Sequence, residues 1–197
     1  MELADWRRRV FSLYATVRAT HGAQDAWKLW RDARDELFRS HPQSPLPDAR
    51  RGSFSRIDYF GYDPSFRLRA TVAEAAPMHY DIATSSDTSL GFTRFGVARF
   101  EMADQSCELE LYWLDGYGGG IFLPFKDATN GETTYGGGRY LLDTVKGADL
   151  GTEGDALILD FNFAYNPSCS YDPRWVCPLS PTQNHLDLAI EAGERFT

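Results

Sequence analysis

Three residues near the C-terminal end of the chain carry side chains that bind metals or act as nucleophiles. Cys169, Cys177 and His185 follow one another at intervals of eight residues. Zinc takes thiolate and imidazole ligands in a tetrahedron, and its sites usually include two ligands only a few residues apart. This spacing contains no such close pair, and a fourth ligand would have to come from His79, His41 or an acidic residue. The pattern therefore predicts no bound metal and no cofactor.

The two cysteines of this segment admit three other roles. A disulfide between Cys169 and Cys177 is disfavoured in a reducing compartment, where we expect the protein to reside. A nucleophilic Cys169 needs a neighbouring base, which the fold would have to supply from His185. The favoured interpretation is that both thiols pack as small apolar groups beneath a loop held by prolines.

Carboxylates on two strand-like segments are candidate acid–base groups. Asp160 and Asn162 point to one face if they belong to a single strand, and Arg139 and Asp143 likewise share a face. Two carboxylates on facing strands act as acid and base when burial separates their pKa values. Solvated positions on an outer face are the default interpretation. Arg139 would either hold an anion bidentately or pair with Asp127 or Asp143.

The segment from Asn166 to Pro178 is a candidate wall of a binding site. Prolines at 167, 173 and 178 end the preceding strand and stiffen the excursion. Loops carried on rigid β scaffolds frequently hold binding residues. The aromatic and polar side chains that we expect to converge there are Tyr117, Tyr135, Arg139, Asp160, Asn162, Tyr165, Asn166 and Tyr171.

Two helices must precede these segments. Apolar residues recur at helical spacing in two stripes, which we interpret as core-facing. The stripes comprise Leu3, Trp6, Val10, Leu13 and Val17, and then Trp27, Trp30, Ala33 and Leu37. The proline-rich segment 40–52 cannot continue a helix, because proline removes a backbone donor and fixes φ.

From residue 53 onward the apolar period changes to two, which predicts strands with one buried face. The clearest alternation lies in residues 66–72, 107–113 and 157–163, with Val72 and Trp113 on the predicted buried faces. Weaker strands are expected at 78–84, 90–102, 120–125, 139–145 and 186–190.

Glycine and asparagine mark the predicted turns between these strands. Asn130-Gly131 suits a type I′ hairpin turn. The triplets 118–120 and 136–138 run into strands rather than helices and lack a phosphate-loop pattern. They therefore predict turns or bulges at the rim of a curved sheet.

The composition narrows the class of protein. The 197 residues carry a formal net charge of −8, which disfavours a nucleic-acid partner, and 43% of them are hydrophobic. No apolar stretch approaches the roughly 20 residues of a membrane span, and no signal peptide is evident. We expect a cytoplasmic protein with no membrane partner and with reduced cysteines; its oligomeric state is open.

Long motifs in the second half of the chain resemble a known family. The segments are YWLDGYGGGIFLPFKDATNGETTYGGGRYLLDT, residues 112–144, and LDFNFAYNPSCSYDPRWVCPLSPTQNHL, residues 159–186. Together with SPLP and YFGYDP in the first half, they resemble the bacterial and archaeal family called domain of unknown function 1684. The resemblance implies about one domain, and it lends no activity or catalytic residue because the family is uncharacterised.

These observations predict a single β-rich α+β domain over residues 1–197. Residues 1–40 form a helical cover, and residues 53–197 form a strongly bent antiparallel sheet or partly open barrel with the two helices packed across it. The leading functional hypothesis is small-molecule binding at one end of the sheet, under the 166–178 loop. The alternatives are a hydrolase that uses Asp160 or Asp143 as acid or base, or Cys169 as nucleophile, and an interaction module without a small-molecule site.

Overall fold

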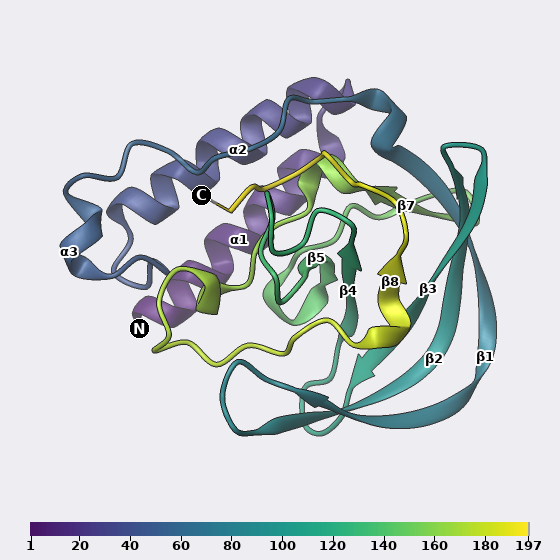
Figure 1. Ribbon diagram of the computed structural model, residues 1–197. Coiled ribbons are helices and arrows are strands. Elements are labelled where there is room, and N and C mark those ends of the chain that lie inside the picture. The colour runs from purple at the N-terminus through teal and green to yellow at the C-terminus, as the bar shows by residue number, and fades with distance from the viewer. Residues whose placement is uncertain (197) are drawn as a thin grey trace.

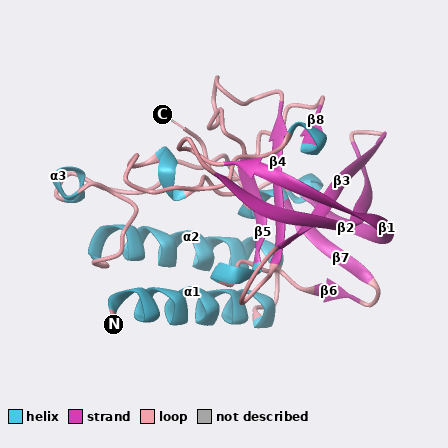
Figure 2. Ribbon diagram, turned by 90° about the horizontal axis from the view of Figure 1, so that it is seen from below, coloured by secondary structure: helices cyan, strands magenta, loops and turns pink. Residues whose placement is uncertain are grey.

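The computed structural model describes residues 1–196, in which an N-terminal helical layer precedes a β-rich body (Figure 1). Helix α1 spans Glu2–Ala19, α2 spans Ala23–Ser40 and the short α3 spans Asp48–Arg51. Helices α1 and α2 lie side by side, with the sheet next to them (Figure 2). Both apolar stripes are confirmed in their central turns, where Leu13 and Trp30 are buried, whereas Leu3 at the start of α1 is exposed.

The body is an eight-stranded bent sheet that does not close into a barrel. Its strands are β1 (Arg67–Ala83), β2 (Ser89–Met102), β3 (Gln105–Leu114), β4 (Ile121–Asp127), β5 (Arg139–Asp143), β6 (Thr152–Glu153), β7 (Ala156–Asp160) and β8 (His185–Leu186). The order is β5-β4-β3-β2-β1-β7-β6, with antiparallel neighbours, and β8 pairs with β4 in parallel. The predicted β-rich α+β class and antiparallel sheet are confirmed.

Two bulges at the same level of the sheet produce its bend. The β1–β2 register shifts between Glu74 and Met78, and the β2–β3 register shifts between Arg94 and Gly96. Pro77 lies inside the first bulge, where a residue without an N–H costs no ladder hydrogen bond. A bulge bends its strand and increases the local twist, so the two together curl the sheet over its core.

The structure corrects two predictions about the strands. The expected strands 66–72 and 78–84 belong to one strand, β1, which continues through the irregularity. Trp113 is 46% exposed while its neighbour Tyr112 is buried, so the predicted face of Trp113 is wrong. The reason is that a second apolar cluster, in which Tyr112 packs with Phe92 and Phe122, covers the opposite face of the sheet from Leu111 at this end of β3. Val72, just before the β1 bulge, is likewise 41% exposed.

Two of the predicted strands, 157–163 and 186–190, end earlier in the structure than expected. Strand β7 ends at Asp160, and Phe161–Phe163 forms a 3-10 helix, as do Pro64–Phe66, Thr144–Lys146, Ser168–Ser170 and Thr182–Asn184. The expected strand 186–190 is reduced to β8, because residues 187–190 leave the sheet to form a C-terminal segment.

The predicted type I′ turn at Asn130-Gly131 is also wrong. A type I′ turn needs positive φ at both central residues, but Asn130 and Gly131 lie in a longer connection between β4 and β5, and of these two residues only Gly131 has positive φ. That geometry occurs instead at Ala103 and Asp104, with φ of 50° and 58°, between β2 and β3. The two glycine triplets do lead directly into β4 and β5, as predicted.

The C-terminal segment and the two long helices cover different parts of the sheet. Leu186, Ile190 and Ala192 close the main core against the sheet, and this segment crosses the front of the molecule in yellow (Figure 1). The helices instead pack on Ala148 and Phe163, beyond β5 and β7. The indole Nε1 of Trp27 donates to the carbonyl of Asn162 at 2.9 Å and anchors α2 there. No helix in the described part of the chain combines the length and the apolar character that crossing a bilayer requires.

Gly193 provides a test of how closely the C-terminal segment fits. Its φ is +77°, and a Cβ atom at this position would lie 2.6 Å from the carbonyl oxygen of Ala164 and 2.7 Å from that of Phe161. We predict that Gly193→Ala lowers the free energy of unfolding by at least about 2 kcal/mol, because strain and a backbone clash add. Urea denaturation measures this.

The matched control is Gly154→Ala, which has a similar φ of +61° but open space around its Cβ. It should cost only the left-handed backbone penalty of about 1 kcal/mol. Equal losses for the two variants would contradict the close fit at Gly193.

Candidate functional site

The C-terminal half of the Asn166–Pro178 loop is held by hydrogen bonds to two distant segments. On one side, the indole Nε1 of Trp175 donates to the carbonyl of Pro45 at 3.2 Å, and Arg174 donates to the carbonyl of Ser44 at 3.0 Å. On the other side, the hydroxyl of Tyr140 donates to the carbonyl of Pro178. The loop therefore spans from the proline-rich exit of α2 to the sheet as a fixed structure.

Three cavities lie against this loop. The first, of about 70 Å³, lies between the helices and the start of the loop, and its walls include Tyr14, Arg34 and Tyr165. The second, of about 170 Å³, we call the arginine cavity; it is lined by Arg50, Arg56, Asp58, Asn166, Ser170, Tyr171, Arg195 and neighbouring apolar groups. The third, of about 130 Å³, we call the thiol-side cavity; it is lined by Trp6, Arg7, Lys146, Ser168, Cys177 and others.

The arginine cavity has an uneven balance of charge. Its lining contains three arginines, Arg50, Arg56 and Arg195, but only one carboxylate, that of Asp58. This carboxylate lies 3.4 Å from the Arg195 guanidinium. Arg50 and Arg56 are exposed, and no ion pair to either is found within residues 1–196. The wall therefore carries uncompensated positive charge, which favours a negatively charged occupant.

Residues lining this cavity also hold buried polar atoms that lack hydrogen-bond partners within the described residues. These atoms are Asn166 Oδ1, Ser170 Oγ, Tyr171 Oη and Arg195 Nε. Buried polar groups are nearly always hydrogen-bonded, so four exceptions around one cavity call for an explanation such as bound water or a ligand. All four atoms are shielded from solvent within the cavity wall.

Asn166 is fixed at the wall by a buried acid. The carboxylate of Glu194 accepts hydrogen bonds from the backbone N–H of Asn166 at 3.1 Å and from its Nδ2 at 3.2 Å. Arg34 lies 2.8 Å from the same carboxylate and stacks on Trp30. Burial raises the pKa of Glu194 to about 7, although the charge of Arg34 and the hydrogen bonds from Asn166 act to lower it. This network orients the start of the loop.

Arg139, predicted as a ligand-binding residue, has a structural position instead. Its guanidinium is fully buried and lies 2.8 Å from the carboxylate of Asp127, which is one of the two partners predicted for it. It also donates to the carbonyls of Ile190, at 2.9 Å, and Ala192. Its Nε has no partner among the described residues but is buried, and Arg139 lines none of the three cavities at the loop.

The two candidate acids, Asp160 and Asp143, have separate partners. The default interpretation, that they are solvated on an outer face, is wrong because both are buried. Asp160 is completely buried, with Oδ1 accepting from the N–H of Asn162 at 3.0 Å and Oδ2 lying 3.7 Å from Arg67. Asp143 is buried too, but pairs with Lys146 at 2.9 Å. No hydrogen bond or ion pair joins Asp160 to Asp143 among the described residues, so the facing acid–base pair is not found.

Burial also changes the acidity of Asp160. It raises the pKa of this carboxyl to about 6, against the hydrogen bonds from Asn162 and the charge of Arg67, which lower it. The side-chain amide of Asn162 hydrogen-bonds to the backbone of Asp63. Its Oδ1 accepts from the Asp63 N–H at 2.9 Å, and its Nδ2 donates to the Asp63 carbonyl at 2.8 Å. These two residues lock the end of β7 to the segment before β1, away from the 166–178 loop.

The predicted tyrosines separate into two groups. Tyr135, Tyr165 and Tyr171 lie at the loop: Tyr135 Oη is 3.7 Å from Cys169 Sγ, Tyr165 pairs with Tyr140 through the backbone, and Tyr171 packs on Phe38. Tyr117 is fully exposed between β3 and β4 and lines an open trough with Trp113 and Phe11. Tyr117 therefore does not join the predicted site.

The cysteines and His185 do not gather around one point. Cys169 and Cys177 are free thiols that contact each other, whereas His185 lies 3.3 Å from Asp187 and is half exposed. No group of three or more His, Cys, Asp or Glu side chains within residues 1–196 could hold a metal ion.

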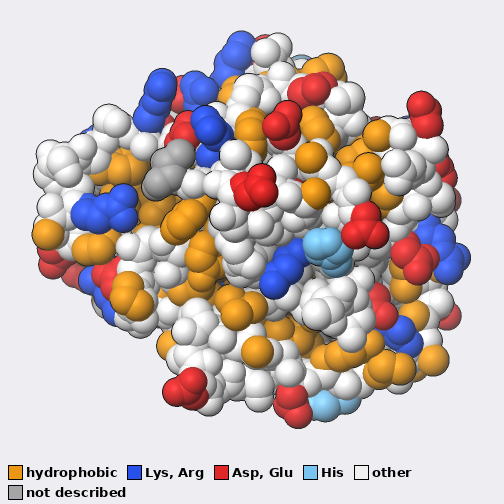
Figure 3. Space-filling model, viewed as in Figure 1, with side chains coloured by type: hydrophobic (Ala, Val, Ile, Leu, Met, Phe, Trp, Pro, Cys, Tyr) orange, Lys and Arg blue, Asp and Glu red, His pale blue; other side chains and the backbone are white. Residues whose placement is uncertain are grey.

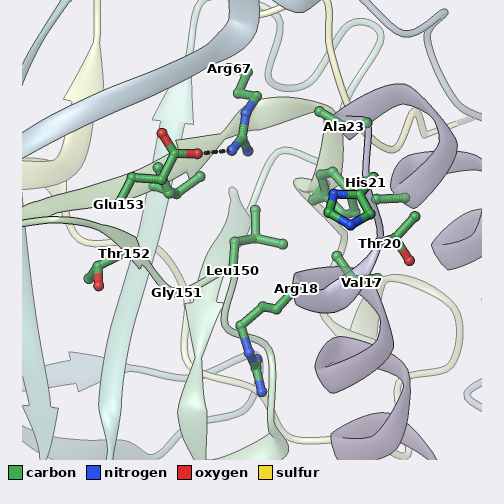
Figure 4. A pocket seen from close by; sticks show the side chains of 14 residues that line it. Val17, Arg18, Thr20, His21, Ala23, Arg67, Leu150, Gly151, Thr152 and Glu153 are labelled. Carbon is green, nitrogen blue, oxygen red and sulfur yellow. Dashed lines mark hydrogen bonds and ion pairs between the residues drawn. The ribbon is translucent and has the colours of Figure 1, made fainter.

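A larger cavity of about 390 Å³ lies at the turn between α1 and α2, opposite β6 and β7 (Figure 4). Its two arginines are already engaged: Arg67 pairs with Glu153 at 2.6 Å, and Arg18 donates to the carbonyl of Asp149 at 2.6 Å. Sequence reasoning did not anticipate this cavity.

Sequence reasoning also missed Arg50, Arg56, Asp58 and Arg195. The basic residues after the proline-rich segment were visible, but nothing local brings residues 50–58 to residue 195. On the face seen in Figure 3, Lys and Arg side chains are interspersed with Asp and Glu. Charge composition alone would thus not have marked this site.

Fold and site together define a β-rich α+β protein with small polar cavities under a proline-stiffened loop. The chain belongs to the family described as protein of unknown function DUF1684, whose family model matches residues 52–195. This confirms the resemblance seen in the sequence.

A solved structure is similar over most of both chains. It is the solution NMR structure of the uncharacterized protein from gene locus rrnAC0354 of Haloarcula marismortui. The identity is 36%, the match covers 84% of this chain and 89% of that one, and the TM-score is 0.61. None of the curated proteins matches this chain.

Replacing Arg139 tests its structural role. We predict that Arg139→Met lowers the free energy of unfolding by about 3–5 kcal/mol, because the substitution leaves the Asp127 carboxylate buried without its partner. Arg99→Met is the control, since its pair with Glu108 is exposed and should contribute about 1 kcal/mol or less. Chemical denaturation compares the two, and similar losses would refute the role assigned to Arg139.

The buried carboxyl of Asp160 predicts a specific pH dependence. Its folded-state pKa lies above the ordinary value of 3.8, so its contribution to stability is complete below about pH 4 and is lost as the pH rises through about 6. Asp160→Asn keeps the oxygen that caps Asn162 but removes the titration. The unfolding free energy of the wild type relative to Asp160→Asn should therefore fall by up to about 3 kcal/mol between pH 4 and 8.

Urea denaturation of both proteins across this pH range provides the measurement. Asp87→Asn removes an exposed carboxyl and should follow the wild-type profile. Parallel profiles for the wild type and Asp160→Asn would show that Asp160 titrates normally.

Proposed function

We propose that this protein binds a small, negatively charged molecule in the arginine cavity. The main support for this proposal is the wall of that cavity. Its residues combine excess positive charge with four buried polar atoms that have no hydrogen-bond partner within residues 1–196. A carboxylate or phosphate offers several acceptor oxygens, which suit the donors of Arg195, Ser170 and Tyr171.

The size of the cavity limits the ligand. A water molecule needs about 10–15 Å³ of such volume, so a cavity of about 170 Å³ has room for on the order of ten non-hydrogen atoms. The apolar part of the wall, which includes Leu46 and Ile57, suits a short hydrocarbon portion. A small organic acid or a phosphate monoester has these properties.

Hydrolysis receives less support. The two candidate acids have separate partners, and a Cys169 nucleophile would need a base, whereas His185 is paired with Asp187. Binding needs no such pair. That Asn166 and Tyr171 of the 166–178 loop line the arginine cavity supports a ligand at this position.

Thermal unfolding with a panel of small carboxylates and phosphate monoesters tests the proposal. We expect at least one compound to raise the Tm of the wild type through preferential binding to the folded state. Arg56→Glu should abolish this shift, because it reverses a charge in the wall. Arg8→Glu, the same change on the exposed surface of α1, should retain it.

Tyr171→Phe provides a second variant with an intact fold. Its hydroxyl lacks a partner within the described residues, so its removal should not lower the Tm of the free protein. It should nevertheless weaken binding of the compound. No shift with any compound, or an equal shift in wild type, Arg56→Glu and Tyr171→Phe, would disprove binding in this cavity.

A further inference from the structure

Two thiols from opposite ends of the 166–178 loop meet beside the sheet. Cys169 lies in the 3-10 helix Ser168–Ser170, and Cys177 lies at the point where the loop returns to the sheet. Cys177 is held by a reciprocal pair of hydrogen bonds: its carbonyl accepts from the N–H of Ser85 at 2.9 Å, and its N–H donates to Ser85 Oγ at 3.1 Å. The position of the second thiol is therefore fixed by the turn between β1 and β2.

The surroundings of Cys169 stabilise a thiolate. The Tyr135 hydroxyl lies 3.7 Å from its sulfur, and the Cys177 thiol and the Ser85 hydroxyl are its other close polar neighbours. All three groups are donors to a thiolate. The donors outweigh desolvation, with the Cys177 thiol the largest contributor, and lower the pKa of Cys169 to about 6. The pKa of Cys177 is raised by its contact with Cys169 and by burial, so one thiol ionises and the other keeps its proton.

This pair is reachable from solvent. Cys169 is only partly buried, and the thiol-side cavity reaches Ser168 and Cys177. Arg7 and Lys146 line the same cavity, and Lys146 supplies positive charge near the Cys177 sulfur. A cavity of about 130 Å³ admits hydrogen peroxide or a short organic hydroperoxide.

We propose that Cys169 is a hydroperoxide-reactive nucleophile and that Cys177 is its resolving thiol. Attack by a thiolate on a peroxide requires no separate base, and a nearby hydroxyl can donate to the departing oxygen. This suits a site whose neighbours are Tyr135, Ser85 and a second thiol rather than a histidine. The proposal is independent of ligand binding in the arginine cavity.

The chemistry balances with the hydroperoxide as oxidant. The Cys169 thiolate attacks the terminal oxygen, an S–O bond forms, the O–O bond breaks, and the leaving alkoxide or hydroxide takes a proton from solvent. The sulfur is thereby oxidised to sulfenic acid while the peroxide is reduced. The Cys177 sulfur then attacks the Cys169 sulfur, the S–O bond breaks, and the hydroxide leaves as water with the Cys177 proton. The product is a disulfide between the two residues.

Alkylation of the reduced full-length protein provides the first test. Peptide mapping after brief iodoacetamide treatment gives separate rates for Cys169 and Cys107, a partly buried thiol whose pKa is raised by burial. The rate at Cys169 should stay nearly constant from pH 7 to 9, whereas that at Cys107 should rise by about tenfold per pH unit. The same tenfold rise at Cys169 would overturn the proposal, and this readout needs no variant.

Treatment with stoichiometric hydrogen peroxide provides the second test. The wild type and Cys107→Ser should lose about 2 Da as the Cys169–Cys177 disulfide forms. Cys177→Ser should stop at the sulfenic acid and form a dimedone adduct on Cys169, and Cys169→Ser should do neither. Tyr135→Phe should slow the reaction at pH 7 because it removes a donor to the thiolate. Loss of mass in Cys169→Ser, or no reaction of the wild type, would refute the assignment.

Discussion

The buried guanidinium of Arg139 is the interaction on which the rest of the structure depends. A charge without solvent must be neutralised and hydrogen-bonded, and Arg139 achieves this with Asp127 from β4 and with the carbonyls of Ile190 and Ala192. Asp127 completes the link by accepting from the N–H of Ile190 at 3.3 Å. The C-terminal segment is thereby drawn over the sheet. This places Glu194, two residues beyond Ala192, where it binds both Asn166 and Arg34. One ion pair thus connects the sheet, the C-terminal segment, the loop and the helices.

The 166–178 loop has a positively charged cavity on one side and a pair of thiols on the other, because its two sides contact different segments of the chain. One side faces residues 50–58 and Arg195, where positive charge collects although the whole chain carries a net charge of −8. The other side faces the turn between β1 and β2, which brings Ser85 to the two thiols. Prolines limit the conformations of the loop, and hydrogen bonds fix it at both ends, at Asn166 and at Pro178. Such rigidity favours binding, since little ordering is needed when a ligand enters.

Much of the fold could be predicted from local pattern, and much of the site could not. The helical stripes, the period-two strands and the glycine turns into β4 and β5 are local features, and the structure retains them. Trp113 was misplaced because a second apolar cluster around Tyr112 covers the other face of the sheet there, and which face is covered depends on segments far away in the chain. Asp160 was expected to be solvated, since sequence alone does not reveal that Arg67 and the helical layer cover the end of β7.

The sequence by itself determined the class of fold, the family, the ends of the helices and the stiffness of the 166–178 loop. These follow from periodicity, proline and glycine, which act over a few residues. Only the tertiary structure decided which polar groups became partners: Arg139 with Asp127, Cys169 with Cys177, and Arg195 with residues 50–58. The physical reason is that burial and hydrogen bonding of a polar side chain depend on segments far away in the chain. Their approach is set by the packing of the whole core, and no local pattern encodes it.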